Sequence, residues 1–157
     1  MAIDRNHLMN FNIPEVRQSY GPRDVAQYAL SIGMGQDPMD MPQLSYVGGL
    51  QDDIRVMPAI ANVLGHPGFW LSDPATGVDA LRLVHGEQGM TVHAPIPVAA
   101  TIRAKTRVTG LIDKGEGRGA LLYSEKEIFD DATGAHLATC RGTTFLRGDG
   151  GFGGPSD

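Results

Sequence analysis

The sequence has almost no cysteine and no long apolar run. Cys140 is the only cysteine among the 157 residues, so no disulfide can form within the chain and a reducing cytosol is the simplest location. No apolar segment approaches the roughly 20 residues that a membrane-spanning helix requires. The N-terminal segment carries Asp4, Arg5 and His7 without the apolar region of a signal peptide. We therefore expect a cytoplasmic protein that does not enter a membrane.

An excess of positive charge is also lacking. The net charge is −5, from 13 Lys and Arg against 18 Asp and Glu, whereas a non-specific nucleic-acid binder needs a clustered basic surface. A local basic pocket for a phosphorylated ligand is still compatible with this charge. His66, His93 and His136 lie far apart, with no Cys or acidic partner at ligand spacing, so we expect no metal site.

The composition is that of one ordinary globular domain, with 41% hydrophobic and 20% charged residues. Residues 1–20 are expected to be extended. A helix is predicted from Pro22, because an apolar stripe follows at helical spacing, and Gly33 ends it. Residues 44–47 suggest a short strand. Residues 57–64 are almost wholly apolar, and the proline near their start and the glycine after them favour a buried helix.

From residue 81 onward the pattern changes to a period of two. Residues 102–108 place apolar side chains on one face and basic side chains on the other, which is typical of a strand with one solvated face. Residues 118–129 and 136–146 predict two more long strands, joined by glycine-containing turns. Cys140 fits a small core residue in the last strand better than a nucleophile. Helices followed by an antiparallel meander indicate the α+β class.

Several short motifs follow one another between about residue 20 and residue 154. They are Tyr28-Ala29-Leu30-Ser31-Ile32-Gly33, Asp37-Pro38, Val63-Leu64-Gly65, Pro67-Gly68, His85-Gly86-Glu87-Gln88, Pro95-Ile96-Pro97, Asp113-Lys114-Gly115 and the glycine-rich end at residues 148–154. In their order and spacing these motifs resemble the N-terminal half of the MaoC-like (R)-specific 2-enoyl-CoA hydratases, in particular the hydratase region of peroxisomal multifunctional enzyme type 2.

The resemblance implies a hotdog fold, in which an antiparallel sheet wraps around a central helix. Residues 1–147 would form this domain, and residues 148–157 a glycine-rich tail or the start of a linker. Family members place two such folds side by side in one continuous sheet and hold acyl-CoA where the two meet. The resemblance therefore implies a homodimer, or a heterodimer with a catalytic hotdog subunit or domain. It implies no cofactor, because acyl-CoA is the substrate.

Hydratases of this family carry a Gly-Asp-x-Asn-Pro-x-His motif in their second hotdog, and nothing in this chain matches it. If Pro38 is superposed on the motif proline, Gly35 takes the place of the aspartate and Asp40 that of the histidine. Glycine cannot accept a proton, so the acid–base pair is broken. We interpret the loop as a degenerate copy left by a duplication and expect no catalytic residue in this chain.

The ligand contacts of the family transfer better onto this sequence. The resemblance implies that His85, Gly86 and Lys114 contact the CoA ester. Lys114 in its turn can reach a phosphate, Gly86 allows close approach of the backbone, and His85 can donate a hydrogen bond. Glu87 and Gln88 are expected to act as a hydrogen-bonding pair at the end of the strand.

Three functions are compatible with the sequence. The first is the acyl-CoA-binding half of an (R)-specific enoyl-CoA hydratase, either one subunit of a two-chain enzyme or one half of a longer chain. The second is a hotdog acyl-CoA thioesterase, which needs a carboxylate that activates water; Asp24, Asp37 and Asp40 are the candidates. The third is a non-catalytic acyl-CoA-binding or scaffold domain.

Overall fold

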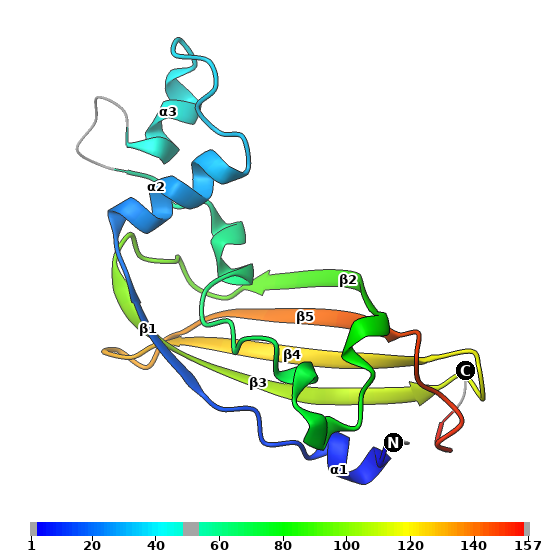
Figure 1. Ribbon diagram of the computed structural model, residues 1–157. Helices are drawn as coiled ribbons and strands as arrows, with labels where there is room; N and C mark the ends of the chain where they lie inside the picture. Colours follow the sequence, from blue (N-terminus) through cyan, green and yellow to red (C-terminus); the bar gives the residue numbers. More distant parts are fainter. Residues whose placement is uncertain (1–2, 49–53, 156–157) are drawn as a thin grey trace.

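A five-stranded antiparallel sheet forms the body of the protein (Figure 1). The computed structural model describes residues 3–48 and 54–155. The strand order is β1-β3-β4-β5-β2, which leaves β1 and β2 at the edges. The strands are β1 (Val16–Tyr20), β2 (Leu83–Val92), β3 (Ala100–Asp113), β4 (Ala120–Asp130) and β5 (His136–Leu146). The long antiparallel strands predicted by the alternating pattern are thus confirmed.

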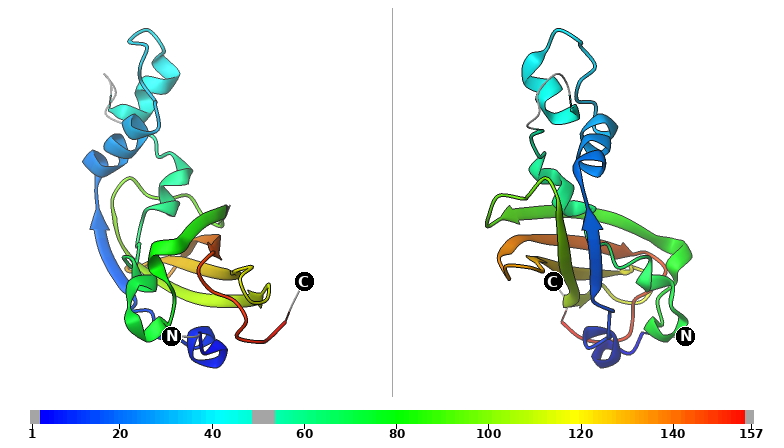
Figure 2. Two further views of the ribbon diagram at one scale, coloured as in Figure 1. Left: turned by 45° about the vertical axis from the view of Figure 1, so that its right-hand side comes forward. Right: turned by 90° about the vertical axis from the view of Figure 1, so that its left-hand side faces the viewer.

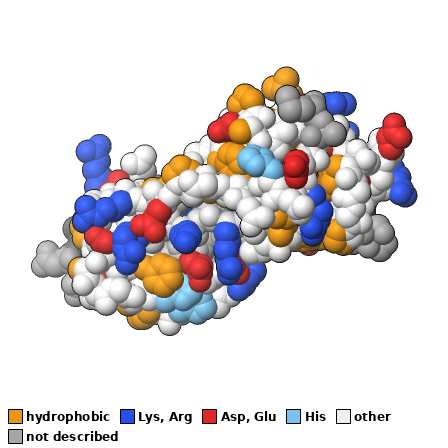
Figure 3. Space-filling model, turned by 90° about the horizontal axis from the view of Figure 1, so that it is seen from below, with side chains coloured by type: hydrophobic (Ala, Val, Ile, Leu, Met, Phe, Trp, Pro, Cys, Tyr) orange, Lys and Arg blue, Asp and Glu red, His pale blue; other side chains and the backbone are white. Residues whose placement is uncertain are grey.

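The side chains of β3 show why the alternation was informative. Ile102 and Ala104 are buried on the inner face of the sheet, whereas Lys105 and Arg107 are exposed on the outer face. The outer face is covered by ion pairs across neighbouring strands, as where the Glu125 carboxylate binds both Arg107 and Arg141. The space-filling view in Figure 3 likewise shows basic and acidic side chains interspersed.

Helices and helical turns precede the long strands or lie between β1 and β2. The α-helices are α1 (Arg5–Met9), α2 (Pro22–Ser31) and α3 (Met41–Val47), and the 3₁₀ turns are η1 (Pro58–Asn62), η2 (Trp70–Ser72), η3 (Pro74–Thr76) and η4 (Ala80–Arg82). Helix α2 confirms the prediction from Pro22. The buried helix expected at residues 57–64 is the shorter turn η1, with Ile60 and Ala61 buried. No helix within the described residues is long and apolar enough to cross a bilayer.

Helix α3 lies where a strand was expected at residues 44–47, so that prediction was wrong. The Asp40 carboxylate caps the helix by accepting hydrogen bonds from the backbone N–H of Gln43 at 3.1 Å and its side-chain amide at 2.8 Å. Gly48 ends it with a φ of 80°, in the left-handed region. Likewise, α1 interrupts the extended segment expected at residues 1–20, because Asp4 accepts from the backbone N–H of His7.

The helices do not fill the inner face of the sheet as a long central helix would. Helix α2 is 10 residues long, and with α3 it forms a projection beyond one end of the sheet (Figures 1 and 2). Only Val25 and Ala29 of α2 are buried. The inner face is covered instead by residues 58–82, whose turn η1 packs against Ala104 and Ile102.

The buried core is divided into two apolar clusters. The first lies near η1 and includes Ile60, Ile102, Ile128 and Ala138. The second lies near α1 and includes Leu8, Leu71, Val108, Leu111, Leu122 and Leu146. Strands β3, β4 and β5 each contribute to both clusters. The stretch of inner face between the two clusters is therefore the place where the sheet is free of large apolar side chains.

Candidate functional site

A band of polar and small residues crosses the inner face between the two apolar clusters. It takes one or two residues from each of four neighbouring strands: Thr106 from β3, Ser124 and Lys126 from β4, Gly142 and Thr144 from β5, and His85 and Gln88 from β2. Strand pairing sets these residues side by side, since Thr106 pairs with Lys126 and Ser124 with Gly142. Such a band at core-facing positions indicates a binding surface.

A β-bulge at Gly86 aims two side chains into this band. The pairing of β2 with β5 shifts between His85, opposite Thr144, and Glu87, opposite Thr143. In a regular strand His85 and Gln88 would point to opposite faces, but the extra residue brings both to the inner face. Glu87 then points outward and accepts a hydrogen bond from the Thr143 hydroxyl at 2.8 Å.

Gln88 is held by the same arrangement, because its side-chain amide donates to the carbonyl of Arg141 at 3.0 Å. The expected hydrogen bonding of Glu87 and Gln88 is therefore confirmed, but the two residues lie in the middle of β2 and not at the end of a strand.

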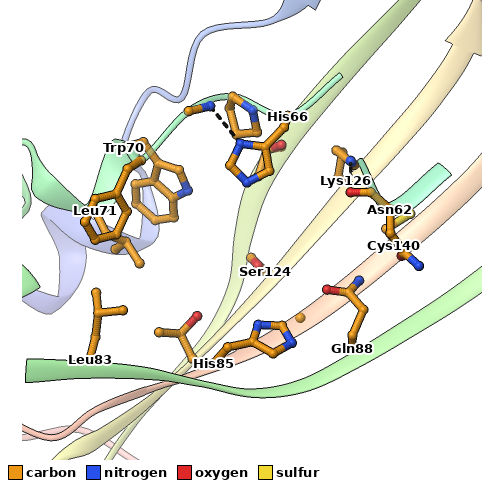
Figure 4. Close-up of a pocket in the computed structure, with 16 residues that line it drawn as sticks. Asn62, His66, Trp70, Leu71, Leu83, His85, Gln88, Ser124, Lys126 and Cys140 are labelled. Carbon is orange, nitrogen blue, oxygen red and sulfur yellow. Dashed lines mark hydrogen bonds between the residues drawn. The ribbon is translucent and has the colours of Figure 1, made fainter. Parts of the chain in front are cut away.

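The band forms the floor of a cavity with a volume of about 270 Å³. Its opposite wall is the segment after η1, which contributes His66, Trp70 and Leu71. Figure 4 shows Trp70, Leu71 and Leu83 at one end and Asn62, Lys126 and Cys140 at the other. The cavity is therefore elongated, apolar at one end and polar at the other. Its volume is close to the lower limit of ligand pockets, which is roughly 300 Å³.

Lys126 is buried at the polar end of this cavity and is 7% exposed. Its ammonium group donates to the carbonyls of Asn62 at 3.0 Å and Leu64 at 2.6 Å, at the C-terminal end of η1. Burial lowers the pKa of Lys126. A lysine at the end of a helical turn satisfies carbonyls that would otherwise lack a donor. Lys126 thus fixes η1 over the sheet.

The sequence analysis did not identify Lys126. Its position could have been noticed, because the alternating pattern of the strand places this lysine on the face that turns toward the core.

Two further polar atoms at this end have no hydrogen-bond partner. Within residues 3–48 and 54–155, the side-chain oxygens of Asn62 and Thr106 are among the few buried polar atoms that make no hydrogen bond. Both residues line the cavity. Cys140 lies beside Lys126 in the strand register, and burial raises the pKa of its thiol, which donates to the Ala61 carbonyl at 3.4 Å. The expected core role of Cys140 is confirmed.

Lys114 lies in the turn between β3 and β4, which the glycine-rich tail braces. The preceding carboxylate, Asp113, accepts from the backbone N–H groups of Gly115 and Gly151, both at 2.8 Å, and of Gly153 at 2.7 Å. These bonds, chiefly the one from Gly151, lower the pKa of Asp113. The two motifs that contain these residues, far apart in the sequence, thus form one structure.

The three predicted ligand contacts are placed as follows. His85 lines the cavity and is exposed, and Gly86 occupies the bulge beside it. Lys114 does not line the cavity. It lies at the same end of the sheet as His85, but β5 and β4 stand between their strands. Three strand spacings separate them by on the order of 14 Å across the sheet. A ligand that contacts all three residues must therefore be long.

The three candidate carboxylates for water activation all have structural partners. Asp24 accepts from the backbone N–H of Gly21 at 2.9 Å, and Asp37 from that of Met39 at 2.8 Å. Asp40 caps α3. All three belong to the projection, and none of them lines the cavity. The geometry gives no support to a water-activating role.

Two of the histidines that lie far apart in the sequence are in contact. The rings of His93 and His136 have centroids 4.2 Å apart, and the Thr139 hydroxyl lies 2.9 Å and 3.1 Å from their respective Nε2 atoms. The pairing of β2 with β5 brings them together. Within the described residues they belong to no group of three or more potential metal ligands.

Comparison with known structures identifies the fold class. A MaoC-like dehydratase from Phytophthora capsici superposes with a TM-score of 0.75 at 21% sequence identity, covering 99% of this chain and 53% of that chain. The five-stranded antiparallel sheet described above is therefore that of a hotdog fold, and the predicted α+β hotdog class is confirmed.

Comparison of sequences identifies the family. The sequence model of the MFE-2 hydratase 2 N-terminal domain matches residues 18–148. Enoyl-CoA hydratase 2, peroxisomal, of Arabidopsis thaliana is 39% identical over 150 residues, which are 92% of this chain and 48% of that protein. Enoyl-CoA hydratase ChsH3 of Mycobacterium tuberculosis is 34% identical over 160 residues, which are 98% of this chain and 54% of that protein.

The chain belongs to the MFE-2 hydratase 2 N-terminal domain family, as its motifs predicted. It spans about half the length of the curated relatives that it matches.

Proposed function

We propose that this chain is the acyl-CoA-binding half of an (R)-specific 2-enoyl-CoA hydratase. The observation that carries the proposal is the cavity of about 270 Å³ on the inner face, which His85 lines next to the Gly86 bulge, in a chain of the hydratase 2 family. Its size suits an acyl group, and it is too small for a complete CoA ester.

The predicted contact residues bind different parts of the CoA ester. His85 donates a hydrogen bond to the pantetheine or phosphate portion, and Gly86 lets the backbone approach it closely. Lys114 provides a cation for a phosphate at the far end of the ligand. The separation of Lys114 from the cavity supports this division, because phosphates and acyl carbons lie at opposite ends of acyl-CoA.

The reaction itself needs groups that this chain does not supply. Water adds across the double bond of a trans-2-enoyl-CoA to give the (R)-3-hydroxyacyl-CoA, with one group removing a proton from water and another protonating the α-carbon. Backbone N–H groups meet the charge that develops on the thioester oxygen. In the loop aligned with the catalytic motif, Gly35 has no side chain and Asp40 is committed to capping α3. We assign the catalytic Asp and His to a second hotdog.

The second hotdog would continue the sheet, either as a separate subunit or as the other half of a longer chain. Two features support such a partner. Strands β1 and β2 are both edge strands, and an exposed edge is a surface for pairing. The α2–α3 projection exposes apolar side chains, with Leu30 at 55% and Met39 at 82%, and exposed apolar patches favour association. The single cysteine is compatible with a cytosolic location.

Calorimetric titration of the chain with crotonyl-CoA and with a long-chain acyl-CoA tests the binding role. Lys114→Ala should weaken binding about ten- to a hundredfold, as expected for a lost charged hydrogen bond. Lys105→Ala removes the same charge from the exposed outer face of β3 and is the matched control. The difference between the two variants should shrink as salt is added. Equal affinities of both variants at low salt would place the phosphates elsewhere.

A thioesterase has weaker support, because Asp24, Asp37 and Asp40 cap local structure away from the cavity. Release of free CoA from acyl-CoA by the isolated chain would favour it. A non-catalytic acyl-CoA-binding domain is distinguished from a hydratase half by adding a hotdog chain that carries the catalytic motif: only the hydratase half would then support hydration.

A further inference from the structure

Gly142 lies at the middle of the cavity floor. Its cross-strand partners are Ser124 of β4 and Gln88 of β2, and all three residues line the cavity. Figure 4 shows Ser124 between the apolar end of the cavity at Trp70 and the polar end at Lys126. A ligand that fills the elongated cavity must therefore pass over Gly142.

The backbone does not require glycine at this position. The φ of Gly142 lies outside the left-handed region, so any residue can adopt the conformation. A Cβ on Gly142 would lie 3.5 Å from Oγ of Ser124, and 3.8 Å from both Oε1 of Gln88 and the carbonyl oxygen of Glu87. These are ordinary van der Waals contacts, so the protein itself leaves room for a side chain.

Close packing explains two other strand glycines, but it does not explain Gly142. A Cβ at Gly86 would lie 3.2 Å from the carbonyl oxygen of Thr143, and one at Gly110 would lie 3.0 Å from the Tyr123 ring, so both positions leave less room for a side chain. Glycine in the middle of a strand weakens the strand, and it often marks a place where a ligand approaches the backbone closely. What glycine provides at Gly142 is therefore the free space above the floor.

We infer that Gly142 sets the length of the acyl chain that the cavity accepts, by letting that chain lie against the backbone of β5. This inference rests on the proposed acyl-CoA binding. Gly142 and Ser124 are only partly buried, so a ligand in the cavity can touch them. Because side chains stand roughly perpendicular to a sheet, a larger residue in place of Gly142 would project toward the opposite wall. A short acyl group would still fit beside it, and a longer one would not.

The test is a series of saturated acyl-CoAs, from butyryl-CoA to dodecanoyl-CoA, titrated by calorimetry into the wild type and into Gly142→Val. Wild-type affinity should rise about fourfold per methylene group while the cavity fills, and then level off. In Gly142→Val the rise should stop at a shorter chain. Butyryl-CoA should bind nearly as well as to the wild type, whereas the longest ligands should lose about tenfold or more in affinity, as expected when two or more methylene groups no longer fit.

The matched control is Gly89→Val, the same substitution in the paired strand β2. Gly89 lies opposite Arg141, and a Cβ there would point to the outer face, 4.0 Å from Cβ of Arg141. This variant should keep the wild-type dependence on chain length. An equal shift in both variants would overturn the inference, because a general change in the sheet would then explain it.

Two other results of the titrations would also overturn the inference while leaving the proposed function intact. One is the same dependence on chain length in Gly142→Val and the wild type. The other is an equal loss at every length, because the valine would then obstruct a part of the ligand that is common to the whole series. If the wild type bound no acyl-CoA at all, the proposed function would be overturned, and the inference with it.

Gly142→Ala separates a role of this glycine in binding from a role in folding. The added methyl group meets only ordinary contacts, and alanine restricts the unfolded chain more than glycine does, so the midpoint of thermal unfolding should hold or rise. The limit on acyl-chain length should shift in the same direction as in Gly142→Val, by a smaller step. A marked fall in the midpoint would show that the fold itself requires glycine there, and would overturn the inference.

Discussion

Asp113 joins two motifs through its hydrogen bonds to the glycine-rich tail, and its charge should therefore contribute to stability. The folded-state pKa lies below the ordinary value of 3.8, so the stabilisation is complete above that value and is lost as pH falls through the lower folded-state pKa. Asp113→Asn should lower the free energy of unfolding by about 2 kcal/mol at neutral pH. The difference in the free energy of unfolding between Asp113→Asn and the wild type should become smaller at acidic pH. Urea denaturation across this pH range measures both effects.

Glu116→Gln is the matched control for Asp113, since it removes an exposed carboxylate from the same turn. This variant should unfold like the wild type throughout. A loss at neutral pH equal to that of Asp113→Asn would attribute the effect to net charge instead of the hydrogen bonds from Gly151 and Gly153.

At the scale of elements, the tail and the β3–β4 turn approach each other too closely for any side chain at Gly150. A Cβ there would lie 2.6 Å from the carbonyl oxygen of Gly115 and 2.9 Å from that of Gly119, and φ is 138°. Gly150→Ala should therefore destabilise the protein by about 1–3 kcal/mol. Because the same contact braces the turn, it should also weaken binding of acyl-CoA at Lys114. Thermal unfolding and titration calorimetry measure the two effects.

The control for Gly150 is Gly89→Ala in β2, where the new Cβ meets its nearest neighbour, Arg141, at an ordinary 4.0 Å. This substitution should be nearly neutral. If both variants were neutral, the close packing of the tail would make no contribution to the turn.

Elements differed in how well the sequence predicted them, for physical reasons. Strand β5 coincides with the predicted residues 136–146, because alternation over many residues specifies both the strand and its buried face. The apolar run at residues 44–47 was too short for any period to register, and the prediction ignored the capping signal from Asp40. A capping interaction involves residues close together in the sequence and can be recognised there, so α3 could have been predicted.

At the scale of the whole molecule, the predicted contact His85 lines the cavity and Gly86 occupies the bulge beside it, but most of the polar floor of the cavity was not predictable. Thr106, Lys126 and Asn62 come from separate elements, and only strand register and the path of residues 58–82 bring them together. Contact between elements is a property of the fold, and a single sequence contains no direct record of it. The proposed boundary at residue 147 stays a prediction.

The isolated chain should also lack most of the hydratase activity, because the catalytic Asp and His are assigned to a second hotdog. The isolated chain should hydrate crotonyl-CoA at least a hundredfold more slowly than when it is mixed with a hotdog chain bearing the catalytic motif, since each general acid or base contributes ~10²–10⁴-fold. Spectrophotometric loss of the enoyl thioester absorbance measures this. Turnover by the chain alone that survives Asp40→Asn would show that its own residues perform the chemistry.

The isolated chain should also associate with other copies of itself. Sedimentation velocity should show a mass that rises with protein concentration, because the edge strands and the apolar residues of the projection favour contact with another chain. Leu30→Glu places a charge on the projection and should reduce the association. A monomer at all concentrations would contradict the proposed sheet continuation.

The division of the core into two clusters has a consequence for how the molecule opens. Each cluster is enclosed by a different part of the chain, η1 for the first and α1 for the second, and the polar band between them contributes little cohesion. Amide hydrogens at the two ends of β4 should therefore exchange with solvent through separate sub-global openings of different free energy. A ligand that fills the cavity would touch both clusters, and the two sets of exchange rates should then converge.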